Sequence, residues 1–195
     1  MTNIIEVQVG LDGIALAHAT NAPEFGLTTV DIYKALAAMP YGKKNTARTW
    51  RDVNPKLPNT KIEVLGPPPT SGTRDAFNEL IMTAACDKNP ATLALKKSDE
   101  PKYKTICTKV REDGPFVEAG ENDNLIVQKL VSNPSAIGLF GYSYLEENSD
   151  KVKGIALNGV KPTYASISSF GYQASRPLYI YAKGQHVRAI RSEEH

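Results

Sequence analysis

Cysteine is scarce in this 195-residue chain, which contains two. Two cysteines are too few for a disulfide-dense small domain or for a four-cysteine zinc module. The chain also lacks an excess of charge of either sign, because 23 basic residues stand against 21 acidic ones spread along its length. Such a balance provides no basic surface for a polyanion, so we expect no nucleic-acid partner.

Long apolar runs are missing as well. No stretch of the chain approaches the roughly 18 apolar residues that a membrane-spanning helix needs. We therefore expect no direct insertion into a membrane. Residues 1–4 have neither the charged region nor the apolar region of a signal peptide. Taken alone, this absence indicates either a cytoplasmic protein or a sequence trimmed upstream.

What is present is the composition of a globular protein, with 41% hydrophobic and 23% charged residues. Apolar alternation predicts strand structure at 4–17, either as two pieces around a Gly-Asp-Gly bend or as one strand with a bulge. Further strands are expected at 61–66, 116–119, 136–142 and 178–182, and helices at 28–39, 71–85, 103–110 and 122–130. Residues 40–60 are expected to form a long surface loop anchored by Trp50. Strands that alternate with helices indicate an α/β fold.

The most informative segment is 62–77, in which a strand runs through three prolines into the start of a helix. A helix start leaves about four backbone N–H groups unpaired and carries partial positive charge, which favours an oxyanion. Ser71 and Thr73 would add hydroxyl donors, Gly72 would allow close approach to the backbone, and Arg74 could supply a bidentate fork. The alternative is that Ser71 or Thr73 only caps the helix.

Segment 71–77 resembles the anion-binding turn of periplasmic phosphate-binding proteins, the substrate-capturing components of phosphate ABC importers. The resemblance extends, in the same order and with similar spacing, over segments 10–17, 27–33, 49–54, 119–124, 136–142 and 175–179. It covers residues 4–187, which is nearly the whole chain. It implies a mixed sheet flanked by helices, as in one lobe of a type II periplasmic binding protein.

The resemblance also implies a division of the chain. Members of the family are bilobed and clamp the anion between lobes, and no stretch before Ile4 can be the anion loop of the first lobe. We therefore expect residues 1–195 to form a single lobe, with antiparallel hinge strands near 7–17 and 177–183. Residues 188–195 are expected to be a tail that is disordered or foreign to the natural protein.

By the same resemblance, the expected function is that of a solute-binding component of a phosphate ABC importer. Inorganic phosphate would bind in an interlobe cleft through Ser71, Gly72, Thr73 and Arg74, without catalysis and without a cofactor. A membrane permease would be the partner and the periplasm the location. The chain departs from the family at 67–69, where prolines replace an arginine that many members place before the turn. Either Arg74 takes over that charge, or the anion is bound with less charge compensation.

Two cysteines and three histidines remain to be assigned. Cys86 and Cys107 are either two free buried thiols or a disulfide, which the even count and an exported protein would favour. The histidines, His18, His186 and His195, lack the spacing of a metal site, so we expect no metal there and incidental or solvent-facing side chains.

Four residues are second-tier candidates at the cleft. Thr70 adjoins the turn, and Asp75 is expected to orient Arg74 from the first turn of the helix. Asn122 is expected to cap a helix that borders the cleft. Ser143 follows a buried strand at its carboxyl end, where open α/β sheets bind ligands.

Two other functions remain open from the sequence. A phosphate-handling hydrolase would use Ser71 or Thr73 as its nucleophile, but it would need a nearby base, and neither a histidine nor a metal motif lies near the turn. A structural or signalling module that keeps the fold without a ligand is the other alternative.

Overall fold

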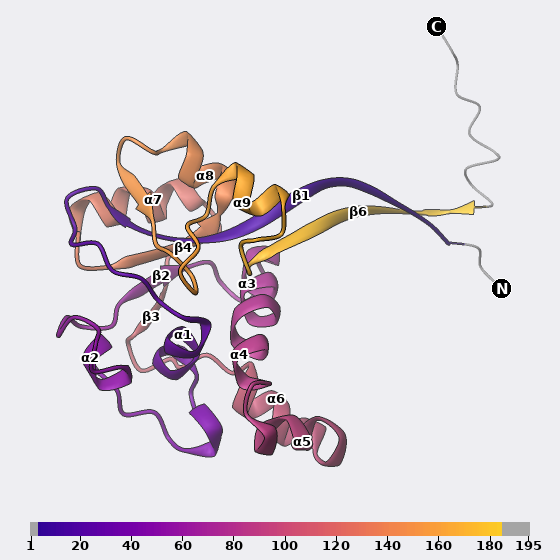
Figure 1. Cartoon of the computed structure of the whole chain (residues 1–195), viewed down its shortest axis with the longest axis horizontal. Coiled ribbons are helices and arrows are strands. Elements are labelled where there is room, and N and C mark those ends of the chain that lie inside the picture. Colours follow the sequence, from indigo (N-terminus) through magenta and orange to yellow (C-terminus); the bar gives the residue numbers. More distant parts are fainter. Residues whose placement is uncertain (1–3, 185–195) are drawn as a thin grey trace, which may run out of the picture.

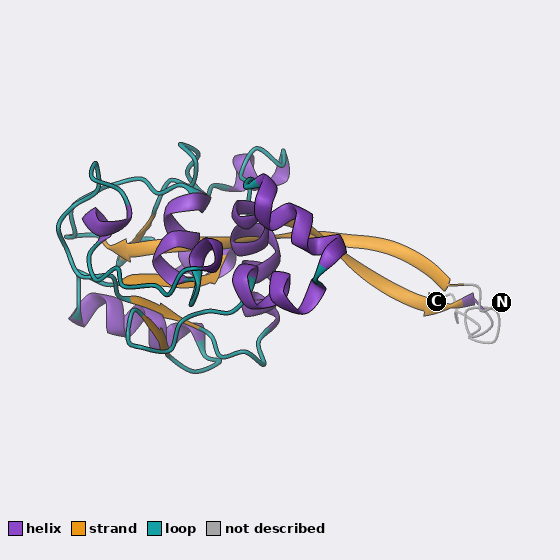
Figure 2. Ribbon diagram, turned by 90° about the horizontal axis from the view of Figure 1, so that it is seen from below, coloured by secondary structure: helices purple, strands orange, loops and turns teal. Residues whose placement is uncertain are grey.

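The computed structural model describes residues 4–184, and its centre is a mixed six-stranded sheet (Figures 1 and 2). The strands are β1 (Ile4–Ala19), β2 (Val64–Gly66), β3 (Phe116–Glu118), β4 (Ile137–Gly141), β5 (Val152–Gly154) and β6 (Ser175–Lys183). Their order is β3-β2-β4-β1-β5, with β6 paired to β1 off this path. Strand β2 is parallel to β3 and β4, whereas β1 is antiparallel to β4, β5 and β6. The expected α/β fold with a mixed sheet is confirmed.

Helices cover both faces of this sheet (Figure 1). They are α1 (Thr29–Leu36), α2 (Trp50–Val53), α3 (Gly72–Phe77), α4 (Ala84–Cys86), α5 (Pro90–Ser98), α6 (Glu100–Cys107), α7 (Asp123–Ser132), α8 (Tyr142–Glu147) and α9 (Tyr164–Ser168), with a 3₁₀ turn η1 (Pro40–Gly42) and a π-helical segment η2 (Asn78–Thr83). Alternation along β1 sends Ile14 and Leu16 into the core under α1, and Ala15 and Ala17 into the core under α7.

Strand β1 is one strand with an irregularity between Gln8 and Gly10, as the second of the two sequence interpretations had it. The part of β1 before this bulge, residues 4–9, lies outside the body of the protein and pairs only with the outer part of β6. The two segments form a projecting ribbon (Figures 1 and 2). We call residues 4–9 and 178–183 the arm. The expected antiparallel adjacency of the two terminal segments is confirmed by the pairing of Ile4 with Lys183.

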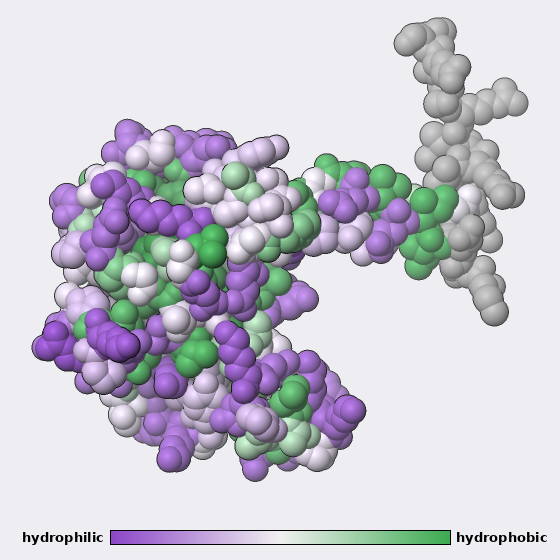
Figure 3. Space-filling view, viewed as in Figure 1, coloured by the Kyte–Doolittle hydropathy of each residue, from purple (hydrophilic) through white to green (hydrophobic). Residues whose placement is uncertain are grey.

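The arm is amphipathic. From the register, one face carries apolar side chains and the other carries mainly polar and aromatic ones, the apolar set being Ile5, Val7, Ile180 and Ala182. Val7 is 50% exposed and Ile180 58% exposed, and Figure 3 shows apolar side chains at the surface along this ribbon. Within the described residues, nothing covers this apolar face.

The expected helix 71–85 forms as a continuous rod of α3, η2 and α4, since the junction residues keep right-handed helical backbone angles. The rod ends at Cys86, which is bridged to Cys107 at the end of α6 with the two Cα atoms 5.4 Å apart. Both cysteines are fully buried. The structure therefore confirms the disulfide and excludes the alternative of two free thiols.

Several expectations were wrong in detail. The segment 40–60 is not only loop, because Thr49 forms a capping box with Asp52 and starts α2. The helix expected at 103–110 begins at Glu100 and ends at Cys107, and α5, α8, α9 and β5 were not expected.

His18 is 3% exposed rather than solvent-facing, because it lies near the carboxyl end of β1, where this strand pairs with β5, and its Nδ1 is 2.7 Å from the carbonyl oxygen of Ala19. His186, His195 and the expected tail 188–195 lie outside the described residues. Among the described residues, the helices are all too short or too polar to cross a membrane.

Candidate anion-binding site

The predicted site residues follow the carboxyl ends of the parallel strands. Strands β2, β3 and β4 are parallel, so their carboxyl ends lie on the same side of the sheet, at Gly66, Glu118 and Gly141. The loops after β2 and β3 lead to the amino ends of α3 and α7, and β4 passes directly into α8. Open α/β sheets bind ligands at this carboxyl edge. The topology therefore brings the turn at 70–75, Asn122 and Ser143 to the same side of the molecule.

The turn itself is a helix start with unused donors. Ser71 caps α3, its hydroxyl oxygen accepting from the Thr73 N–H at 3.2 Å, and its carbonyl oxygen accepts from the Arg74 and Asp75 N–H groups. The Gly72 N–H and the Thr73 hydroxyl have no partner among residues 4–184. A Cβ atom built on Gly72 would meet nothing within 4 Å. The capping role proposed as the alternative is thus real for Ser71, and it leaves open space beside the backbone.

Arg74 is the buried charge of this region. It is 7% exposed, one Nη donates to the carbonyl oxygen of Pro67 at 3.1 Å, and its Cζ atom lies 4.2 Å from the centre of the Phe116 ring. Its Nε has no partner, and no carboxylate in the described chain forms an ion pair with it. Burial lowers the pKa of the guanidinium, although the negative charge of Glu118 opposes this effect.

This geometry corrects one expectation. Asp75 is exposed and does not orient Arg74 through an ion pair. The guanidinium instead points back along the helix to the proline loop, as long side chains in helices generally do. Arg74 therefore connects the proline loop, through the Pro67 carbonyl, to the Phe116 ring.

The neighbouring loop is tied to the turn. The Thr70 hydroxyl donates to the Glu121 carboxylate at 2.7 Å, and Asn122 caps α7 as expected, accepting from the Asn124 N–H. Asp123 follows in the first turn of α7, where burial raises the pKa of its carboxyl group and the Gly141 N–H, 3.4 Å from Oδ2, opposes this. Polar contacts thus link the loop after β2 to the loop after β3, and the first turn of α7 to the end of β4.

Ser143 lies farther along the same edge, where it lines a hollow of about 570 Å³ at the base of the arm. Asp12, Tyr142, Tyr164 and Leu178 are also part of its lining. The structure gives no contact between Ser143 and the turn. Among residues 4–184, no group of three or more His, Cys, Asp or Glu side chains could hold a metal ion.

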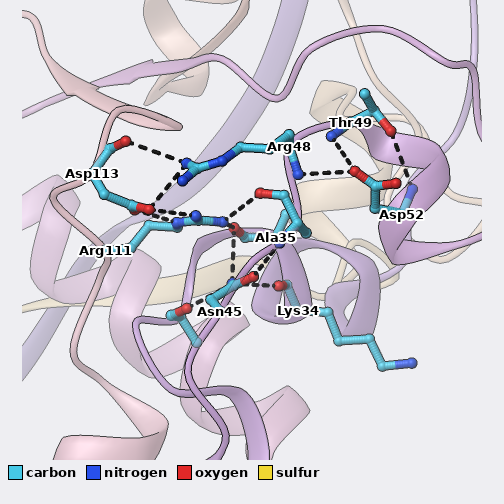
Figure 4. A network of polar contacts seen from close by, with 10 residues as sticks. Lys34, Ala35, Asn45, Arg48, Thr49, Asp52, Arg111 and Asp113 are labelled. Atoms are coloured by element: carbon cyan, nitrogen blue, oxygen red, sulfur yellow. Dashed lines mark hydrogen bonds and ion pairs between the residues drawn. The ribbon is translucent and has the colours of Figure 1, made fainter.

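A second polar cluster, shown in Figure 4, lies near the amino end of β3, away from the carboxyl ends of the parallel strands. Buried Arg111 donates to Asp113 (Nη2–Oδ2 2.7 Å) and to the carbonyl oxygen of Ala47, and Arg48 also pairs with Asp113 at 3.0 Å. The two arginines hold the pKa of Asp113 well below its ordinary value. Buried Asn45 donates to the last carbonyls of α1. All of these donors are used within the chain, so the cluster fixes the loop after α1.

Sequence reasoning missed three residues at the turn: Phe116, Glu121 and Asn78. Phe116 and Glu121 come from the β3 region and contact the turn only through the parallel pairing of β2 with β3. Asn78 lies one helical turn after Arg74, and its Oδ1 is buried without a partner. Only Asn78 had a local signal, one residue beyond the segment 62–77, since a residue four positions after Arg74 shares a helix face with it.

Comparison with known proteins places this geometry in a family. The model of a PBP superfamily domain matches residues 1–192. The phosphate-binding protein PstS of Staphylococcus saprophyticus is 33% identical over 140 residues, which are 69% of this chain and 35% of that protein. The protein SphX of Synechococcus elongatus is 29% identical over 187 residues, 93% of this chain and 47% of that protein.

Solved structures agree on the fold. A possible phosphate binding protein from Planctomyces limnophilus has a TM-score of 0.67 and 27% identity, over 96% of this chain and 58% of that chain. An ABC-type phosphate transport receptor from Vibrio cholerae has a TM-score of 0.66 at 19% identity, over 95% of this chain and 64% of that chain. The chain thus spans only part of the length of these relatives, and by its sequence and its sheet topology it belongs to the PBP superfamily.

Proposed function

We propose that this chain is one lobe of the solute-binding component of a phosphate ABC importer, and that it binds inorganic phosphate through Ser71, Gly72, Thr73 and Arg74. The names of its relatives support the ligand class, since PstS is a phosphate-binding protein and the Vibrio cholerae structure is a phosphate transport receptor. In this proposal binding involves no chemistry and no cofactor. The chain works in the periplasm and delivers phosphate to a membrane permease.

The observation that carries the proposal is the state of Arg74. A buried cation is costly unless it is paired, and Arg74 has one neutral acceptor, one aromatic ring and no ion pair within the described chain. An oxyanion at the turn would supply the missing negative charge. This supports the first of the two options left by the three prolines, in which Arg74 replaces an arginine before the turn.

The backbone of the turn supports the same ligand. The Gly72 N–H and the Thr73 hydroxyl lack partners within residues 4–184, and the space beside Gly72 is open. Glycine is not required there by a positive φ or by a packed neighbour. A molecule from outside the chain that approaches the backbone is a sufficient reason for its presence. Thr70, Asp75, Asn122 and Ser143 would form the rim of the site.

The arm supports the division into lobes. Its apolar face is uncovered in the described chain, and the Planctomyces limnophilus relative has about two fifths of its length outside the matched region. In the proposed arrangement, residues 7–17 and 177–183 are hinge strands and a second lobe packs on the arm. That lobe would also supply the opposing donors of the anion clamp, so the lobe described here should bind phosphate weakly.

The test is a phosphate titration of the 195-residue chain, followed by the amide resonances of Gly72 and Thr73. These resonances should shift with phosphate and shift less with sulfate. Replacing Thr73 by Val should weaken binding roughly tenfold, because one hydrogen bond to a charged ligand is lost. Arg74→Ala should weaken it at least as much.

The matched control is Thr105→Val. Thr105 is an exposed threonine on α6 whose hydroxyl donates only to a backbone carbonyl. This variant should bind as the unaltered chain does. Unchanged phosphate binding in both the Thr73 and Arg74 variants would show that the turn is only a helix cap.

A further inference from the structure

Two buried side-chain atoms without partners belong to residues four positions apart on the helix that follows the turn. They are the Nε donor of Arg74 and the Oδ1 acceptor of Asn78. Among the described residues, buried side-chain atoms of this kind are few, because leaving a buried donor or acceptor unpaired costs free energy. A donor and an acceptor that are both left unpaired, four residues apart on one helix, are complementary partners for a hydrogen bond.

Their placement makes this bond accessible. Residues four apart lie on the same face of a helix, and a helical side chain leans back over the preceding turn. By this rule the side chain of Asn78 leans over the helical turn that carries Arg74. Nε is the guanidinium nitrogen closest to the Arg74 backbone. The two Nη groups lie beyond it, where one of them contacts Pro67.

The backbone at this point is also adjustable. The Asn78 N–H is shared between the carbonyl oxygens of Arg74 and Asp75, and the π-helical segment η2 begins at Asn78. A shared hydrogen bond allows a small shift of Asn78 without leaving its N–H unpaired. Insertions of π-helix inside α-helices occur frequently at functional sites.

We propose that Asn78 is a positioning residue of the anion site. When an oxyanion occupies the turn, Asn78 Oδ1 accepts the Nε–H of Arg74, and the two Nη groups turn from the proline loop toward the anion. In the structure described here the guanidinium contacts the Pro67 carbonyl oxygen and the Phe116 ring instead. The inference rests on the proposed function, because it assigns how the same site directs its positive charge.

The experiment is a double-mutant cycle in the full 195-residue chain, with inorganic phosphate as the probe. Asn78→Leu removes the acceptor and keeps the number and branching of the side-chain heavy atoms. It should weaken phosphate binding roughly tenfold, since a hydrogen bond to a charged group is lost. In an Arg74→Lys background, which has no guanidinium Nε–H, the same substitution should change binding less than about twofold. The control Asn59→Leu, at an exposed loop position, should bind as the unaltered chain does.

A second measurement follows the Arg74 Nε–H resonance. In the unaltered chain, phosphate should slow its exchange with water, and in Asn78→Leu it should not. Asn78→Asp is isosteric and keeps an acceptor, so it should slow the exchange with or without phosphate, while its added negative charge weakens phosphate binding.

The outcomes separate the two proposals. If phosphate shifts the Gly72 and Thr73 amides but Asn78→Leu binds within about twofold of the unaltered chain, the positioning role is wrong and the anion site stands. An equal loss from Asn78→Leu in the unaltered chain and in the Arg74→Lys background would also overturn it, because Asn78 would then act through the fold. If phosphate does not shift these amides in the unaltered chain, the proposed function itself fails.

Discussion

Replacing Gly72 by Ala should make the protein more stable and make it a poorer phosphate binder. Gly72 is the first residue of α3, its φ is not positive, and an added Cβ would have no atom within 4 Å. The substitution therefore costs nothing in the folded state and removes conformational freedom from the unfolded chain. Changes of this type stabilise proteins by about 0.4–1 kcal/mol, or about 1–4 °C in Tm for a chain of this size.

The effect on binding should have the opposite sign. If phosphate is held by the Gly72 N–H and the Thr73 hydroxyl, the new methyl group occupies the space through which the oxyanion approaches the backbone. Losing one charge-assisted hydrogen bond costs about 1.5–3 kcal/mol, which is roughly tenfold or more in Kd. Thermal unfolding and a phosphate titration of the same sample measure the two effects together.

Gly138→Ala is the matched control. A Cβ on Gly138 would lie 2.7 Å from side-chain atoms of Leu130 and Phe140, so this variant should lose about 1–3 kcal/mol of stability. As long as it folds, its phosphate affinity should not change. Two results would refute the reasoning on Gly72: a lower Tm, which would mean that the space is not open, or an unchanged Kd, which would mean that no anion approaches there.

Two further predictions concern stability. Replacing Cys86 and Cys107 together by Ala should lower the free energy of unfolding by about 3 kcal/mol, because the disulfide closes a loop with a sequence separation of 21. Urea unfolding measures this loss, and an unchanged urea midpoint would contradict the prediction. Because the Arg111 and Arg48 guanidinium groups lower the pKa of Asp113 in the folded state, the stability that they provide is present above the ordinary Asp pKa of about 4 and is lost as the pH falls below it. Asp113→Asn should remove this part of the pH dependence, and an identical acid-unfolding profile in that variant would show that the pairs contribute nothing.

Long segments with a strong apolar pattern could be predicted from the sequence. The near-continuous apolar run of β4 and the Thr28 and Asp31 pair that caps α1 are local signals, and the structure realises both. The elements that were missed have few buried positions. Helix α5 buries only Thr92 among its residues, and β5 buries only Val152. Such elements form through tertiary pairing: β5, for example, pairs with residues 17–19 of β1. A local sequence pattern does not show which segments will be brought together in this way.

The helix start at Ser71 was predictable for the same reason, since a helix cap and its hydroxyl donors are local properties, whereas anion binding at this turn stays a prediction. The orientation of Arg74 was not predictable. It depends on Phe116, which the pairing of β2 with β3 brings beside Gly66, and on the Pro67 carbonyl. Position along the chain suggested that Asp75 would be its partner, whereas the tertiary structure supplies an aromatic face and a backbone acceptor.

The arm has a consequence for protein engineering. Ile4 and Lys183 are paired at its outer end, so the chain enters and leaves this fold one strand spacing apart, about 4.8 Å. A unit with this connection can be inserted into a β-hairpin of another protein without stretching either backbone. After such a graft, a change in the body that alters the pairing of the two arm strands would be transmitted to the host hairpin. A host hairpin that replaces residues 4–9 and 178–183 would show whether the body folds without the arm.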